Sequence, residues 1–141
     1  MNNKIDLLFV EDNEDYIEFV KRALNNINKE IVLDYVTDGK DAIEYFEKKA
    51  AQPQGTAKLI IMDINLPGMN GIQVLRKIRT IPQLKYVPVV MFSSSSNADD
   101  IKKSYDCGAN GYIVKPLGLR PLTETLQSIV DFWLARNYCC N

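Results

Sequence analysis

Residues 59 to 62 of this chain form the run Leu59-Ile60-Ile61-Met62, which is apolar at every position and ends directly at Asp63. A strand with one solvated face alternates polar and apolar residues, whereas a strand covered on both faces is apolar throughout. The run therefore predicts a central strand of a parallel sheet with helices on both faces. Asp63 would then lie at the carboxyl end of that strand, where open α/β sheets bind their ligands.

Short apolar runs and amphipathic helical patterns alternate five times along the chain. The runs that predict strands are residues 5–10, 31–36, 59–62, 88–92 and 111–114. Apolar residues spaced three or four apart predict helices at residues 14–27, 40–49, 71–79, 99–105 and 119–136. Such alternation is typical of right-handed βαβ units. We therefore predict a doubly wound, flavodoxin-like α/β fold, in which five helices flank a five-stranded parallel sheet of order 2-1-3-4-5.

Length and composition fit one globular domain. The 141 residues are 46% hydrophobic and 25% charged, and no linker or repeat divides them, so residues 1–141 are expected to form a single domain. The net charge of −1 offers no basic surplus for a nucleic acid. No apolar stretch is long enough to span a bilayer, and the first residues have no signal-peptide pattern. We expect a cytoplasmic protein that binds neither nucleic acid nor membrane.

The chain has three cysteines and no histidine. The odd cysteine count, without an export signal, favours reduced thiols. The adjacent Cys139 and Cys140 could form a redox or metal element, but incidental thiols in a loose terminus are the simpler interpretation. The absence of histidine excludes imidazole bases, Ser-His-Asp triads and most zinc sites.

Charged residues follow two more of the predicted strands. Glu11 and Asp12 come after the first strand, and Lys115 comes after the fifth. Because the carboxyl ends of parallel strands meet at one edge of the sheet, these side chains should converge with Asp63. Clustered carboxylates repel one another unless a cation is bound, and Mg²⁺ prefers such hard oxygen ligands. The pattern suggests a divalent metal, a carboxylate that accepts a phosphoryl group, and a lysine that holds the phosphate.

Four segments, taken together and in this order, resemble the receiver domain of two-component response regulators. They are LFVED at residues 8–12, MDINLPGMNG at 62–71, PVVMFS at 88–93 and GANGYIVKP at 108–116. The resemblance covers residues 4–136, nearly the whole chain. Residues 128–134 and 88–115 further resemble the small, chemotaxis-regulator-like proteins that are paired with bacterial phytochrome histidine kinases.

The resemblance implies a role for each charged residue. Asp63 would be the phosphoacceptor, and Asp12 and Asp63 would bind Mg²⁺ directly. Glu11 would contribute to the metal through water or in part, and the main-chain carbonyl of Asn65 would be a further ligand. Lys115 would pair with the phosphoryl oxygens. Taken singly, Asp63 could instead open a turn, and the acids at residues 11 and 12 could form a solvated helix start.

The resemblance also implies a switch. Ser93 would be the hydroxyl that is drawn to the phosphoryl group, and Tyr112 the aromatic ring that then moves inward, although aromatic residues are common in strands in any case. Asn65 and Ser95 fall at positions that tune hydrolysis of the acyl phosphate. A cis peptide bond is implied before Pro116.

The expected function is that of a single-domain response regulator, which is a signalling protein and not an enzyme beyond self-catalysed phosphoryl uptake and hydrolysis. A partner sensor histidine kinase, of the phytochrome kind, would phosphorylate Asp63. The fourth helix, fifth strand and fifth helix would then change and contact a downstream protein target. Phe132 and Leu134 flank the apolar stripe of the last helix. They are either peripheral core residues or part of a homodimer interface on this face.

Other interpretations fit less well. A phosphohydrolase of the haloacid-dehalogenase kind would place its nucleophile after the first strand and a second acid where this chain has Asn65. A flavodoxin-like FMN carrier would need an anion-binding loop after the first strand, but residues 11–15 read EDNED. A degenerate receiver used only for docking would not need the intact set of Asp12, Asp63, Ser93 and Lys115.

Overall fold

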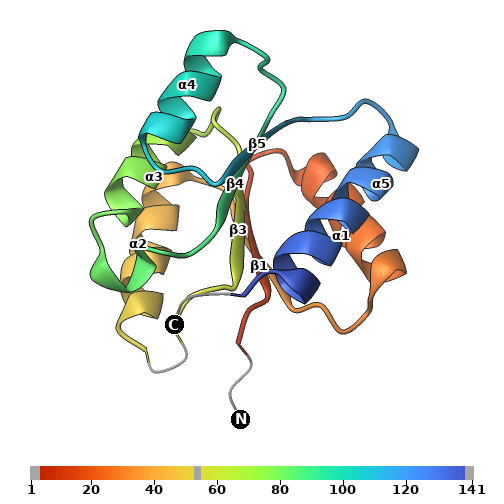
Figure 1. Ribbon diagram of the computed structural model, residues 1–141, viewed down its shortest axis with the longest axis horizontal. Helices are drawn as coiled ribbons and strands as arrows, with labels where there is room; N and C mark the ends of the chain where they lie inside the picture. Colours follow the sequence, from red (N-terminus) through yellow and green to blue (C-terminus); the bar gives the residue numbers. More distant parts are fainter. Residues whose placement is uncertain (1–3, 53–54, 139–141) are drawn as a thin grey trace.

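The computed structural model describes residues 4–52 and 55–138, which form a five-stranded parallel sheet with helices on both faces (Figure 1). The sheet order is β2-β1-β3-β4-β5, as predicted. On one side lie α1 and α5, and on the other lie α2, α3 and α4 (Figure 1). The strands are β1 (Leu7–Val10), β2 (Leu33–Val36), β3 (Leu59–Met62), β4 (Val89–Ser93) and β5 (Gly111–Val114).

The helices α1 to α4 begin at polar side chains that accept hydrogen bonds from the free N–H groups of the first turn, whereas α5 begins at Gly118 without such a cap. These N-caps are Asn13, Asp38, Asn70 and Asn97. The helices are α1 (Glu14–Ile27), α2 (Gly39–Ala50), α3 (Gly71–Ile78), α4 (Ala98–Asp106) and α5 (Leu119–Ile129), with a short 3₁₀ helix at Pro82–Leu84. The helix predicted for residues 119–136 is continuous, but it changes to π-helical hydrogen bonding over Val130–Arg136.

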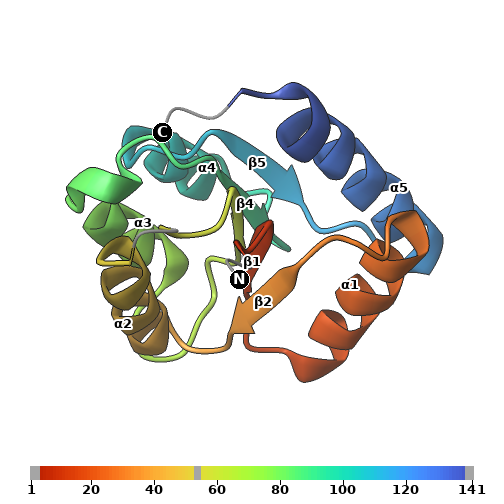
Figure 2. The same cartoon turned by 90° about the horizontal axis from the view of Figure 1, so that it is seen from below.

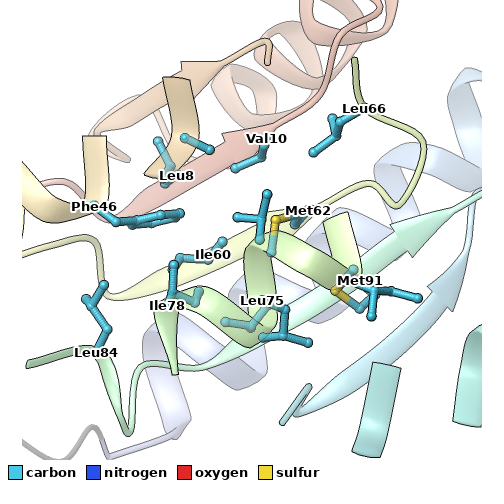
Figure 3. Close-up of a cluster of buried hydrophobic side chains, with 14 of the residues drawn as sticks. Leu8, Val10, Phe46, Ile60, Met62, Leu66, Leu75, Ile78, Leu84 and Met91 are labelled. Carbon is cyan, nitrogen blue, oxygen red and sulfur yellow. The ribbon is translucent and has the colours of Figure 1, made fainter. Parts of the chain in front are cut away.

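Figure 2 shows helices on both faces of the sheet, and two hydrophobic layers hold them to it, one on each face. Side chains of successive strand residues point to opposite faces, so β1 and β3 supply both layers. Toward α2 and α3 they present Leu8, Val10, Ile60 and Met62, packed on Phe46, Leu75 and Ile78 (Figure 3). The other layer, under α1 and α5, contains Leu7, Phe9, Leu59 and Ile61. This double coverage explains the uninterrupted apolar runs.

Some element bounds differ from the predictions. β1 begins at Leu7 and β2 at Leu33, because the side chain of Asp6 accepts the Val32 N–H at 2.8 Å ahead of the ladder. β4 extends to Ser93, whose carbonyl accepts the Lys115 N–H at 2.8 Å. The peptide bond before Pro116 is trans, since no peptide bond among the described residues is cis, and the expected cis bond is therefore wrong. Trans is the lower-energy isomer even before proline.

Within residues 4–52 and 55–138, no helix combines the length and the apolar character needed to cross a membrane.

Candidate functional site

The charged residues singled out from the sequence gather at the carboxyl edge of the sheet. Glu11 directly follows β1 and Asp63 directly follows β3. These strands are neighbours in register, and the Asp63 N–H donates to the Val10 carbonyl at 3.0 Å. Lys115 follows β5, which lies two strands from β3 and three from β1, and its long side chain reaches back to both acids. The sheet order thus unites residues that lie far apart in the chain.

Lys115 bridges the two buried carboxylates. Its Nζ lies 2.5 Å from Glu11 Oε1 and 2.9 Å from Asp63 Oδ2. Each acid uses its other oxygen to accept a main-chain N–H: Glu11 from Asn13 at 3.2 Å, and Asp63 from Asn65 at 3.3 Å. The side chain of Glu11 is only 1% exposed, so its charge depends on these contacts for stabilisation.

Burial governs the electrostatics of this group. Burial raises the pKa of the Glu11 carboxyl above its ordinary value, and the Lys115 ammonium only partly offsets that rise. Burial alone would lower the pKa of Lys115, but its hydrogen bonds and charge interactions with Glu11 and Asp63 together raise it. Lys115 is therefore a firmly charged ammonium that acts as the internal counter-ion of the site.

The carboxylates of Glu11, Asp12 and Asp63 form a group that could hold one metal ion. Each offers an oxygen, and the three oxygens lie within 4.8 Å of one another. Asp12 is exposed and the other two are buried, so the group opens to solvent on one side only. A donor set made only of oxygens fits Mg²⁺ or Mn²⁺ and does not fit a soft metal. When all three carboxylates are ionised, their three negative charges exceed the single positive charge of Lys115, which favours binding of a further cation.

Ser93 and Tyr112 are linked through Ser95, which hydrogen-bonds to both of them. Ser93 is fully buried at the end of β4, and its Oγ accepts the Ser95 N–H at 3.2 Å. The Tyr112 hydroxyl donates to the Ser95 carbonyl at 2.9 Å. The Ser95 hydroxyl in turn donates to Asp100 Oδ2 at 2.7 Å, which joins the loop to α4. One residue of the β4–α4 loop therefore contacts both predicted switch residues and the next helix.

Gly71 allows α3 to approach the backbone of Asp63. A Cβ atom at Gly71 would lie 2.0 Å from the Asp63 carbonyl oxygen, which is far inside contact distance. The Gly71 N–H also donates to the Ile64 carbonyl at 2.8 Å. The start of α3 thus holds the turn that carries Asp63, which gives a physical reason for glycine in the segment MNG at residues 69–71.

Comparison with known proteins identifies the family. The sequence pattern of the response regulator receiver domain matches residues 7–127 of the chain. The protein belongs to the receiver domain family. That match covers most of the chain, including Glu11, Asp12, Asp63, Ser93 and Lys115.

Relatives of this receiver domain include regulators of phytochrome signalling. Response regulator Rcp1 of Synechocystis is 33% identical over 131 residues, covering 91% of this chain and 88% of that protein. The crystal structure of the phosphorylated cyanobacterial phytochrome response regulator RcpA superposes with a TM-score of 0.88 at 34% identity, covering 98% and 99% of the two chains. The Mn²⁺-bound form of Rcp1 superposes with a TM-score of 0.83 at 31% identity, covering 96% and 98%. The predicted family and fold are confirmed.

Sequence reasoning missed two residues of this receiver domain. Tyr16, in the first turn of α1, places its ring 4.5 Å from Lys115 Nζ. Its only sequence signal is an aromatic residue four positions after Asp12, beside the inward-facing Ile17. Ser95 was considered only for its effect on hydrolysis, whereas the structure shows it bonded to both Ser93 and Tyr112. The run of serines at residues 93–96 gave no means of telling which one holds this position.

Proposed function

We propose that Asp63 accepts a phosphoryl group from the histidine of a partner sensor kinase, with Mg²⁺ bound, and that the domain signals through α4, β5 and α5. The observation that supports this most directly is the position of the Asp63 carboxylate, bonded to Lys115 and grouped with two further acids. Receiver domains are signalling proteins that histidine kinases phosphorylate, and this chain belongs to that family.

Sheet topology favours Asp63 over Glu11 and Asp12 as the phosphoacceptor. Asp63 follows β3, which lies between β1 and β4 in the sheet. A phosphoryl group on Asp63 would have the acids of β1 on one side and the end of β4, with Ser93, on the other. Glu11 and Asp12 follow β1, whose other neighbour is β2, so they lie one strand further from β4 and Ser93 than Asp63 does.

Glu11, Asp12 and Asp63 would hold Mg²⁺, with the main-chain carbonyl of Asn65 as a further ligand. When bound, the ion neutralises charge on the transferring phosphoryl group and helps to orient it. The relative Rcp1 has a solved Mn²⁺-bound form, which supports a divalent cation here. Three acids gathered within 4.8 Å give this chain the matching oxygen donors.

Lys115 would change partner during the reaction. Its ammonium now bonds Asp63 Oδ2, an oxygen that must either attack phosphorus or accept the metal. A charged amine with three donors can move from that carboxylate to the oxygens of the new phosphoryl group. Lys115 therefore balances the negative charge before the reaction and after it.

Ser93 would carry the change into the β4–α4 loop. If its hydroxyl turns to a phosphoryl oxygen, the Ser95 N–H loses the acceptor that it now has at 3.2 Å. The Ser95 carbonyl also holds the Tyr112 hydroxyl, so a shift of this loop would release or redirect that ring. The loop is thereby a two-state element that phosphorylation can bias.

Exposed apolar side chains on the proposed output face support a protein partner or a second copy. Tyr105 of α4, Val114 of β5 and Phe132 after α5 are exposed, by 49%, 45% and 54%. Leu134, in contrast, packs against the core under α1 and α5, so of the two flanking residues only Phe132 is free for an interface.

Size-exclusion chromatography with light scattering, with and without an acyl-phosphate mimic, tests for a homodimer. A Phe132→Ser variant that dimerises equally well would argue against Phe132 as a contact.

Exposure to acetyl phosphate and Mg²⁺, followed by intact mass measurement, tests the central proposal. The wild type should gain one phosphoryl group that hydroxylamine removes, as expected of an acyl phosphate. Asp63→Asn keeps the shape and should gain nothing. Asp15→Asn is the matched control, because Asp15 is an exposed acid of α1 outside the carboxylate group. No gain in the wild type, or an equal gain in Asp63→Asn, would overturn the assignment.

A further inference from the structure

Tyr16 contacts the site from α1, yet the steps proposed above do not use it. Several contacts fix its position. Its main-chain N–H donates to the side chain of the N-cap Asn13 at 3.0 Å. Its ring centroid lies 6.4 Å from that of Phe9 and 6.1 Å from that of Phe92, in tilted arrangements. The helix cap and two core aromatic residues of β1 and β4 therefore hold the ring in place.

The face of the Tyr16 ring contacts the Lys115 ammonium. The 4.5 Å from Nζ to the ring centroid is within the range of roughly 6 Å for cation–π attraction. The Lys115 side chain is only 15% exposed, so water screens this attraction little. Such a contact both lowers the energy of the charged amine and restricts where it can lie.

The ring is the one contact of this ammonium, among those of the described residues, that does not carry charge. The other two are Glu11 and Asp63, and both change in the proposed reaction. A metal ion would compete for their oxygens, and phosphorylation would convert the Asp63 carboxylate to an acyl phosphate. A neutral ring keeps the same interaction through all of these steps.

The surroundings of the Tyr16 hydroxyl indicate that the ring, and not the hydroxyl, makes the useful contact with Lys115. Its oxygen is buried and has no hydrogen-bond partner among the described residues. Burial, with a further contribution from the charges of Glu11 and Asp63, raises the pKa of Tyr16 to about 12, so the phenol stays neutral. An unpaired buried hydroxyl destabilises a fold, so a phenylalanine should do as well or better here.

We propose that Tyr16 is a positioning residue for Lys115, whose ring holds the ammonium beside Asp63 while the carboxylates exchange partners. This inference rests on the proposed phosphoryl transfer to Asp63. Tyr16 acts through Lys115 and need not touch the phosphoryl group.

Two variants separate the ring from the hydroxyl. Tyr16→Phe keeps the ring and removes the unpaired hydroxyl, and Tyr16→Leu removes both but stays apolar. With acetyl phosphate and saturating Mg²⁺, Tyr16→Phe should be phosphorylated at nearly the wild-type rate. Tyr16→Leu should be about three- to tenfold slower, the loss expected for one partly buried cation–π contact. Equal rates for the two variants would overturn the proposal.

A double-mutant cycle separates positioning from packing. In a Lys115→Gln background, Tyr16→Leu should cause no further decrease in rate if Tyr16 acts through Lys115. A decrease as large as in the wild-type background would show a general packing role and sink the proposal.

Proton NMR of the Lys115 ε-methylene group tests the contact without metal or phosphoryl donor. These protons should be shifted upfield by the ring in wild type and in Tyr16→Phe, and should lose that shift in Tyr16→Leu. An unshifted resonance in the folded wild type would disprove the contact even if the leucine variant failed to fold. A wild type that shows the shift but is never phosphorylated would instead disprove the proposed function.

Discussion

Lys115 Nζ lies 2.5 Å from Oε1 of Glu11, a residue that is 104 positions away in the chain and almost fully buried. The same ammonium bonds Asp63 at 2.9 Å. One lysine therefore offsets part of the charge that the carboxylates bring to the sheet edge. A divalent ion binding to these acids must compete with Lys115 for their oxygens, which links metal binding, phosphoryl transfer and stability.

Replacing Lys115 by glutamine should destabilise the metal-free protein and strengthen Mg²⁺ binding. The variant leaves Glu11 and Asp63 without their ammonium, which should lower the free energy of unfolding by about 2–4 kcal/mol. It also removes the competing cation, so Mg²⁺ should bind more tightly and restore more stability than in the wild type. Urea denaturation with and without Mg²⁺, together with calorimetric titration, measures both effects.

Lys102→Gln is the control for that substitution, because Lys102 pairs with Asp106 on the exposed surface of α4. It should change neither stability nor Mg²⁺ affinity measurably. Weaker Mg²⁺ binding in Lys115→Gln would contradict the competition.

Glu11→Gln should remove a specific pH dependence of stability. The pKa of Glu11 is raised by burial in the folded state, so its contribution is favourable at pH below the ordinary glutamate value. That contribution is lost as the pH rises through the folded pKa, because the buried carboxyl must then ionise. In the absence of metal, the stability of the wild type relative to Glu11→Gln should therefore fall as the pH rises above the ordinary glutamate pKa and through the higher pKa of the folded state.

Mg²⁺ should weaken this fall, since a bound cation stabilises the ionised carboxylate. Urea denaturation of both proteins at several pH values provides the difference curve. A difference that is independent of pH would show that Glu11 is ionised at its ordinary pKa.

Gly71→Ala should disturb the phosphoacceptor turn. The added Cβ would meet the Asp63 carbonyl oxygen at 2.0 Å, so α3 or the turn must shift. We expect a loss of about 1–3 kcal/mol in unfolding free energy, despite the better helix propensity of alanine, and slower phosphorylation. Gly111→Ala is the control, because its Cβ would meet only Val90 at an ordinary 3.6 Å. Chemical denaturation and intact mass measure the two quantities, and equal behaviour of the two variants would refute this role of Gly71.

Tyr112→Phe should uncouple the β4–α4 loop from β5 while leaving phosphoryl uptake intact. The variant removes the hydrogen bond of 2.9 Å to the Ser95 carbonyl but keeps the ring. Asp63 should be phosphorylated at close to the wild-type rate, since Tyr112 makes no contact with it among the described interactions. Hydrogen exchange in residues 94–106 should be faster before phosphorylation and should change less upon it. An unchanged exchange response would mean that this hydrogen bond does not transmit the signal.

Much of the molecule follows from the sequence, because strands covered on both faces must be apolar and helix starts need polar caps. The run at Leu59–Met62 was predicted to the residue, as was α1 with its cap Asn13. Parallel strands place their carboxyl ends together, so the sequence alone predicts one sheet edge for Glu11, Asp12, Asp63 and Lys115. Local pattern and sheet topology suffice for these conclusions.

Other features depend on how separate elements pack, which no local pattern encodes. The ring of Tyr16 reaches Lys115 only because α1 packs on the sheet with this ring against Phe9 of β1 and Phe92 of β4. Ser95 hydrogen-bonds to both Ser93 and Tyr112 because of the path that the β4–α4 loop takes. Gly71 lies close to the Asp63 carbonyl because of where α3 packs. The sequence determined which chemical groups stand at the sheet edge. Tertiary packing decided which of them touch, because distances between elements are set by the side chains that fill the space between them.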